Sequence, residues 1–219
     1  MLLFGNLSPQ LLIAVLIAVL IGMTVHEFAH NYVAYLMGDD LPLREGRLTL
    51  NPMVHINWFG FLMFVLIGFG VLGTAPVSAQ RLGYKRLGIR FGARWGYLAA
   101  VAAGPVSNLL VAIVFALVYR LFAGIIQSSD ALSLLIFQII FWNVLLFVFN
   151  LLPFFPIDGW HIVYSLLPAD LADTWRQYAQ TTQYVLLGLI FIGLFIPRLN
   201  ILGSIIYQPA LQIVSLLIR

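Results

Sequence analysis

Residues 11–37 read LLIAVLIAVLIGMTVHEFAHNYVAYLM, an apolar run that carries three ionisable side chains within five positions. A bilayer core of about 30 Å needs about 20 apolar residues in a helix, so this run is long enough to cross it. Ser8 and Pro9 precede the run as a helix cap and a first-turn proline, and Gly38-Asp39-Asp40 ends it. We therefore predict a transmembrane helix that holds a polar site.

The composition extends this prediction to the whole chain. Of its 219 residues 62% are hydrophobic, and only 11 Lys and Arg and 8 Asp and Glu are charged, whereas about a quarter of the residues of soluble proteins are charged. This excludes a water-soluble globule, a disordered chain and a nucleic-acid-binding protein, so we expect a lipid bilayer and no nucleic acid around it. The chain has no cysteine, which excludes disulfides, thiolate metal ligands and cysteine nucleophiles. Because residues 1–25 lack the basic start of a signal peptide, we expect the first helix to be retained.

Four further apolar stretches are separated by prolines, glycines and charged residues. They run from Tyr97 to Arg120, from about Ala131 to Leu152, from about Gln183 to Ile196, and from Leu199 to Ile218. The last of them either spans the membrane or only dips into it. We predict an all-α membrane protein with about five transmembrane segments, built as a single polytopic domain over residues 1–219. Its core motifs lie at about 20–165 and a C-terminal helical hairpin at about 175–219.

The segment from Leu48 to Gln80 has no charged residue but is broken by prolines and glycines, and its core, Ile56 to Leu72, is long enough to cross the membrane. A crossing would separate Arg44 and Arg47 from the basic cluster at 81–94, against the tendency of Lys and Arg to collect on the cytoplasmic side. A re-entrant hairpin keeps both groups on one side, and irregular backbone is tolerated at membrane depth where it packs on protein. We therefore predict re-entry.

Basic residues also predict the orientation. With the N-terminus outside, eight Lys and Arg fall in inner loops and two in outer loops. The inner residues are Arg44, Arg47, Arg81, Lys85, Arg86, Arg90, Arg94 and Arg176, and the outer ones are Arg120 and Arg198. This asymmetry favours an N-terminus outside and inner loops in the cytoplasm.

The histidines of His26-Glu27-Phe28-Ala29-His30 lie one turn apart on one face of the first helix, where both can bind one metal ion. Glu27 lies beside them, placed to take a proton from water and pass it on during metal-assisted hydrolysis. The alternative is a pair of buried histidines satisfied by neighbouring groups. Ionisable residues in a membrane span are costly, and three of them within five residues indicate a wet, functional cavity instead.

A zinc site with two histidines needs a third protein ligand and an open position. The remaining candidates are His55, His161, Glu45, Asp39, Asp40, Asp130, Asp158, Asp170 and Asp173. Asp158 differs from the others because Pro153 and Pro156 interrupt the helix before it, although a Pro-Asp-Gly stretch is also typical of an ordinary turn. At 1.5 Å per residue, His26 lies about 22 Å below the outer start of its helix, in the cytoplasmic third of the membrane. The third long span delivers Asp158 to the same level, so the two motifs can meet.

Together these motifs resemble the site-2 protease family of intramembrane zinc metalloproteases. The shared marks are His26-Glu27-x-x-His30, Ala103-Gly104-Pro105-x-x-Asn108, and Asn150-x-x-Pro153 through Asp158-Gly159. The stretch from Gly46 to His55 is also similar to a segment of the compact prokaryotic branch, so we expect neither a PDZ domain nor a nucleotide-sensing domain. The likeness covers about residues 20–165, and Phe155 departs from it because relatives often have a small residue or proline there.

The resemblance implies zinc on His26, His30 and Asp158, with Glu27 as the catalytic acid and base. It also implies cleavage of transmembrane helices of other proteins near the cytoplasmic face, in a prokaryotic cell membrane. Asn108 and Asn150 either donate hydrogen bonds to the substrate carbonyl or hold helices together.

Two other histidines are also assigned. His55 either reaches the metal region or is a satisfied interfacial histidine, and we expect no role for His161.

Two rival functions remain open at this point. A metal carrier or helix-binding chaperone would keep the histidines but would have no need of Glu27. A membrane hydrolase of lipids or small peptides would keep all three residues.

Residues Arg44 to Leu50 predict a small cytoplasmic β element. They form either an edge strand that pairs with an unwound substrate or a short connecting loop.

Re-entry can be tested in this cysteine-free chain. Single cysteines at Asn57 and Ala75 should both react with an impermeant thiol reagent from the cytoplasmic side, because a hairpin returns its two ends to one face. Labelling from opposite faces would contradict the hairpin and change the sidedness of every later span.

Overall fold

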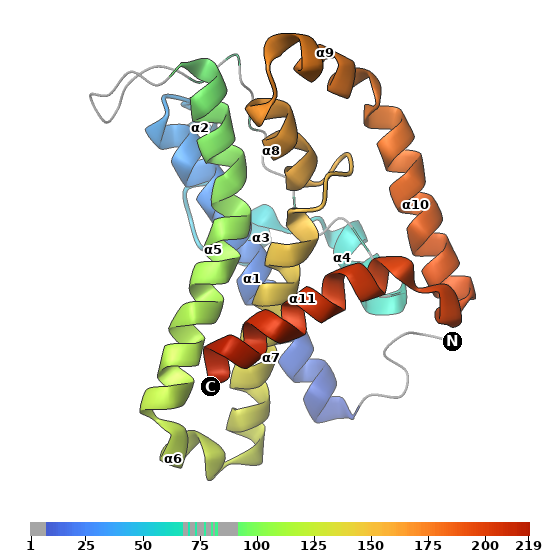
Figure 1. Cartoon of the computed structure of the whole chain (residues 1–219). Helices are drawn as coiled ribbons and strands as arrows, with labels where there is room; N and C mark the ends of the chain where they lie inside the picture. The colour runs from blue at the N-terminus through green and yellow to red at the C-terminus, as the bar shows by residue number, and fades with distance from the viewer. Residues whose placement is uncertain are drawn as a thin grey trace.

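The computed structural model describes residues 8–67, 70, 73, 77, 80, 82 and 92–219, and helices dominate this part of the chain (Figure 1). Four helices are long and apolar enough to cross a membrane: α1 (Pro9–Leu36), α5 (Ala93–Leu121), α7 (Asp130–Asn150) and α11 (Ile201–Ile218). A fifth candidate is the pair α9 (Ala169–Gln177) and α10 (Ala179–Phe195), which meet at a 52° bend. The prediction of an all-α membrane protein with about five spans is confirmed.

Shorter helices connect these long ones. They are α2 (Leu41–Arg44), α3 (Pro52–His55), α4 (Trp58–Ile67), α6 (Ala123–Gln127) and α8 (Asp158–Leu166), with a 3-10 turn at Pro197–Leu199. Helix α1 begins at Pro9 because the Ser8 side chain accepts the backbone N–H of Leu11, as expected of a cap. Helix α5 begins four residues before its predicted start, since hydropathy does not register a polar first turn.

The core of the protein is formed by α1, α5 and α7, which pack against one another (Figure 1). In both α1 and α5 every fourth residue along one line is buried, and most of these residues are small. The buried lines are Ala14, Ala18, Gly22, His26, His30 and Ala34 in α1, and Ala100, Gly104, Asn108, Ala112 and Ala116 in α5. Residues four apart form a ridge on a helix surface, and small ridge residues let two backbones approach closely in a membrane. We call these two lines the α1 ridge and the α5 ridge.

Helix α7 closes the third side of this core. A Cβ atom added at Gly22 of the α1 ridge would lie 2.8 Å from Cδ1 of Leu146 and 3.0 Å from Oδ1 of Asn143, so α7 packs directly on the α1 backbone. Helix α11 crosses α5 and α7 (Figure 1) and buries Ala210 and Val214 in one apolar cluster with them.

The two ends of the segment between Ile56 and Gly73 lie together, as the predicted hairpin requires. Helix α4 has ten residues and is only about 15 Å long, too short to cross a bilayer core of about 30 Å. Ile56 and Gly73 form an antiparallel bridge, so the chain leaves this point and returns to it. Phe64 of α4 packs edge-to-face on Trp142 of α7, with ring centroids 5.7 Å apart, which holds the hairpin against the core.

Part of this region lies outside the described residues. That part includes Ala75 and most of the predicted basic cluster, namely Arg81, Lys85, Arg86 and Arg90.

The prediction of a small β element is wrong. No strand runs through Arg44 to Leu50, all of which the structure describes, so the alternative of a connecting loop holds there. The physical reason is local: Pro42 lies in the first turn of α2, and Gly46 turns the chain with φ of +66°.

Arg94 has a structural role that the charge pattern did not predict. Its guanidinium donates from Nε to the carbonyl of Ser165 and from Nη2 to the carbonyl of Leu167, at the end of α8. A cation is favourable at a helix C-terminus, where carbonyls lack helical partners. Arg94 therefore fastens α8 to the first turn of α5.

Ridge packing predicts a sensitivity to side-chain size. Ala18→Leu would force a larger side chain into a fully buried position, and overpacking typically costs about 1–3 kcal/mol. We expect a lower midpoint of thermal unfolding in detergent. Ile17→Leu at the neighbouring position, which is 37% exposed, is the matched control and should melt like the parent protein. Equal midpoints for both variants would contradict close packing at Ala18.

Candidate metal centre

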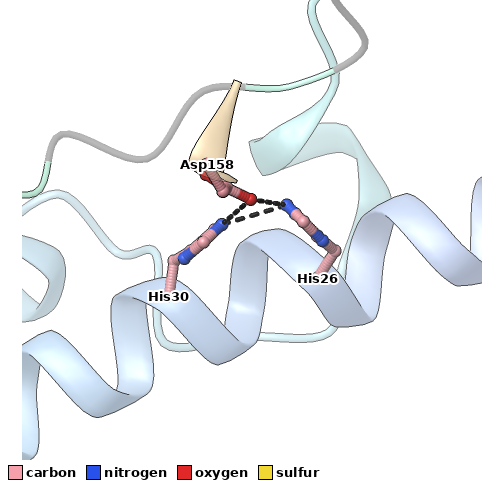
Figure 2. Close-up of side chains that lie close together, drawn as sticks. All are labelled: His26, His30 and Asp158. Atoms are coloured by element: carbon pink, nitrogen blue, oxygen red, sulfur yellow. Dashed lines mark hydrogen bonds and ion pairs between the residues drawn. The ribbon is translucent and has the colours of Figure 1, made fainter. Parts of the chain in front are cut away.

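Three residues from two distant parts of the chain converge on one point (Figure 2). The α1 ridge brings the imidazoles of His26 and His30 together, with 2.9 Å between their Nε2 atoms. Asp158, the first residue of α8, approaches from the other side, and its Oδ2 lies 3.1 Å from Nε2 of His26 and 3.3 Å from Nε2 of His30. The predicted meeting of the two motifs is what the geometry shows.

Hydrogen bonds fix the protonation of both histidines. Nδ1 of His30 lies 2.8 Å from the carbonyl oxygen of Ala100, which can only accept, so Nδ1 carries the proton. Nδ1 of His26 lies 2.8 Å from Oδ1 of Asn108. The Asn108 amide is oriented by its Nδ2, which donates to the carbonyl of Gly22, so its Oδ1 accepts from His26. A neutral imidazole with its proton on Nδ1 has a lone pair on Nε2, so in this tautomer both Nε2 atoms can bind a metal ion.

This arrangement fits a metal ion. Two nitrogen lone pairs and Oδ2 of Asp158 face one another, and this oxygen accepts no hydrogen bond from the described residues. Three acceptors this close repel one another unless a cation lies between them. Two imidazoles and one carboxylate, with the other ring nitrogens held by hydrogen bonds, are a typical donor set for zinc.

Asn143 of α7, which the sequence analysis did not identify, extends the hydrogen bonds that hold His26. Asn108 also donates from Nδ2 to Oδ1 of Asn143, and Asn143 donates from its own Nδ2 to the carbonyl of Ile139. Both amides are fully buried. They connect α7 through α5 to the imidazole of His26. The signal in the sequence was an isolated amide in the middle of an apolar span, which is costly unless bonded.

Gly104 of the α5 ridge lets the backbone of α5 pass directly beside the histidines. A Cβ atom added at this position would overlap Nε2 of His30 and lie 2.7 Å from Cε1 of His26. A residue without a side chain is therefore required where α5 meets the site.

The carboxylate of Glu27 lies in the same site. Its side chain is buried, with 6% of the residue exposed, and its Oε2 has no hydrogen-bond partner among the described residues. Gly73, on the returning part of the hairpin, covers this carboxylate: an added Cβ atom there would lie 2.6 Å from Oε1 of Glu27.

A cavity of about 390 Å³ opens onto these groups. Its walls come from α1, α5, α7, α8 and α10, together with Gly70, Gly73 and Val77. Asn150 at the end of α7 lines the cavity, and its Nδ2 donates to the carbonyl of Leu146 in its own helix, which leaves its second amide hydrogen.

The other sequence candidates lie in different places. Asn108 is buried between the three core helices and does not line the cavity, which favours the helix-joining alternative. His55 is buried on α3, where its Nε2–H donates to the carbonyl of Thr49 at 2.7 Å, and it does not line the cavity either. His161, for which we expected no role, lies in the cavity wall.

Comparison with known proteins identifies the family. A Bacillus subtilis protein named "Putative zinc metalloprotease YwhC" is 36% identical over 213 residues, which cover 94% of this chain and 88% of that protein. The chain belongs to the site-2 protease family. Two proteins named "Putative zinc metalloprotease Rip2", from Mycolicibacterium smegmatis and Mycobacterium tuberculosis, are 26% and 28% identical, and each alignment covers 86% of this chain and 69% of the relative. No family model and no solved structure matches the chain.

As a site-2 protease, the chain is an integral membrane metalloprotease with zinc as its cofactor. The resemblance stated from the motifs is confirmed. The group of His26, His30 and Asp158 is compatible with that ion.

Because α5 passes so close to the histidines at Gly104, we predict that a side chain at this position lowers the affinity for zinc. Gly104→Ala would push the imidazoles of His26 and His30 off their positions, and misplacing metal ligands typically costs about 10–100-fold in affinity. Zinc per protein, measured by elemental mass spectrometry against a chelator series, should fall accordingly. Gly188→Ala in α10 is the control, because an added Cβ there meets nothing within 4 Å. Unchanged affinity in Gly104→Ala would show that α5 does not constrain the histidines.

Proposed function

We propose that this site-2 protease hydrolyses peptide bonds within or near transmembrane helices of membrane-protein substrates, close to the cytoplasmic face. His26, His30 and Asp158 hold the zinc ion, and Glu27 is the catalytic acid and base. The observation that carries the proposal is the convergence of two imidazole Nε2 atoms and a carboxylate oxygen beside the buried Glu27, whose Oε2 has no hydrogen-bond partner among the described residues.

The chemistry divides between the metal and the protein. When bound, zinc lowers the pKa of water toward about 7 and polarises a carbonyl group. Glu27 accepts the proton that water gives up as the new C–O bond forms, and donates it to the nitrogen as the C–N bond breaks. Its Oε2 is suited to this exchange because no described hydrogen bond occupies it.

The depth of the site supports cleavage near one face of the membrane. His26 lies about 26 Å along α1 from Pro9 at 1.5 Å per residue, about two thirds of the way along a helix that can cross the bilayer and past the middle of a core of about 30 Å. If the N-terminus is outside, as the basic residues predict, the half of the helix that holds His26 faces the cytoplasm.

A transmembrane substrate must expose the carbonyl group of the bond that is cut. An intact helix keeps its carbonyls in hydrogen bonds, so a substrate helix has to unwind locally, and helix-breaking residues near the cut should favour cleavage.

In this proposal residues 1–219 act as one polytopic domain. The C-terminal hairpin is included because Leu186 of α10 contributes to the cavity wall.

Glu27→Gln separates chemistry from metal binding. It preserves the size of the side chain but removes the exchangeable carboxylate, so we expect about one zinc per protein and a fall in cleavage of about 10²-fold or more. The measurements are zinc content and the appearance of fragments from a panel of transmembrane peptides, read by mass spectrometry. Full cleavage by Glu27→Gln would refute the proteolytic role, and cleavage of lipids only would favour a lipid hydrolase.

Asp158→Ala removes a ligand instead of the proton carrier. Zinc content and cleavage should fall together, because a site held by three protein ligands cannot easily lose one. His26→Ala and His30→Ala should behave in the same way. Asp170→Ala and Asp173→Ala, both in α9, are the controls and should change neither quantity. Full zinc and activity in Asp158→Ala would disprove the ligand set.

A further inference from the structure

Peptide hydrolysis places negative charge on the carbonyl oxygen, and a hydrogen-bond donor fixed near that oxygen stabilises the transition state. Among the described residues, and besides the metal group and Glu27, three side chains with such donors line the cavity: Tyr97 of α5, Asn150 of α7 and His161 of α8. Asn150 already uses one amide hydrogen within its own helix. Tyr97 and His161 are therefore the other candidates for this donor.

Tyr97 and His161 form a fixed pair. The hydroxyl oxygen of Tyr97 lies 2.9 Å from Nδ1 of His161, and the rings meet edge-to-face with centroids 6.0 Å apart. On its other sides His161 packs against Phe155 and Trp160, with centroids 5.9 Å and 5.0 Å away. The pair joins α5 to α8 at the wall of the cavity.

Helix geometry places the pair next to the metal group. His161 follows Asp158 by three residues in α8, so both side chains lie on one face of that helix. Tyr97 precedes Gly104 by seven residues in α5, two turns along the same face, and Gly104 lies against the histidines. The pair therefore lies beside the metal group, with Tyr97 on α5 and His161 on α8.

The hydrogen atoms of the pair leave one donor free. Burial lowers the pKa of His161, although the Asp158 carboxylate acts in the opposite direction, so the ring is neutral near pH 7. A neutral imidazole has one N–H and a tyrosine one O–H, and one of these two hydrogens forms the bond between them. The other is either the Tyr97 O–H or the His161 Nε2–H. In both tautomers a single donor remains on residues that line the cavity.

We propose that Tyr97 and His161 act as one unit that donates a hydrogen bond to the oxygen of the scissile carbonyl, an inference that rests on the proposed proteolysis. The acidic, proton-moving side of the reaction belongs to Glu27 of α1, whereas this donor comes from α5 and α8. It is already held in position before substrate arrives, so it needs no reorganisation during the reaction.

The test uses Tyr97→Phe, His161→Phe and the double variant, with kcat, KM and zinc content measured on a cleaved transmembrane peptide. Loss of one donor of this kind costs about 10²-fold in kcat, and each single variant should lose about 10-fold or more with its zinc retained. Because the pair presents one donor, the double variant should be no slower than the slower single variant. Tyr164→Phe is the matched control: Tyr164 lies in α8, stacks on Trp160 and does not line the cavity. It should keep the parent kcat.

Three outcomes would overturn the inference, and they differ from one another. Parental kcat in both single variants, with Glu27→Gln inactive, removes the pair from catalysis and leaves the proteolytic function intact. Loss of zinc in His161→Phe makes His161 part of metal binding instead. If the parent protein cleaves nothing that Glu27→Gln leaves intact, the proposed function itself fails, and the inference fails with it.

Discussion

Contact between the α1 and α5 ridges is the constraint on which the rest of the structure depends. Lipid chains are as apolar as leucine, so helices in a membrane associate through close packing and hydrogen bonds. Here the two kinds of contact occupy the same line: small residues bring the backbones together, and His26 and His30 interrupt that line. The bonds from His26 to Asn108 and from His30 to the Ala100 carbonyl join the helices and also orient the two imidazoles that we propose as metal ligands. Packing and the proposed metal site therefore cannot be altered independently at these positions.

The three residues that we propose as metal ligands are positioned by different means. His26 and His30 are set by the period of a single helix, whereas Asp158 depends on where α8 begins and how it is held. Gly159 allows the start of α8 to pack on the backbone of Leu151, where a Cβ atom would overlap the chain. Arg94 holds the other end of α8 through two carbonyls. A short helix fastened at both ends delivers its first side chain to a defined point.

Sequence alone predicted what depends on local patterns and on bilayer thickness. The spans follow from runs of apolar residues, the histidine pair from its spacing of four, and the level of Asp158 from rise per residue. The partners of these groups were not predictable in the same way, because helices that are apolar on all sides do not reveal which face points inward. Asn143 and the Tyr97–His161 pair are known only once the rotation of α5, α7 and α8 is fixed by packing. The expected β element was wrong for a local reason, the turn chemistry of Pro42 and Gly46, which hydropathy does not measure.

The Nδ1 hydrogen bonds of His26 and His30, two of the proposed ligands, have a consequence for how the protein gains and loses its metal. Their hydrogen bonds go to Asn108 and to the backbone of Ala100, and neither bond involves the metal. The conformational entropy of these two rings is therefore lost when the helices assemble, before a metal ion binds. In small zinc domains the ion organises its own ligands, and its binding energy is spent on folding the chain. Here the helices are folded and the imidazoles are held before the ion binds, so the binding energy is not spent on folding. An ion should therefore bind and dissociate without unfolding the protein.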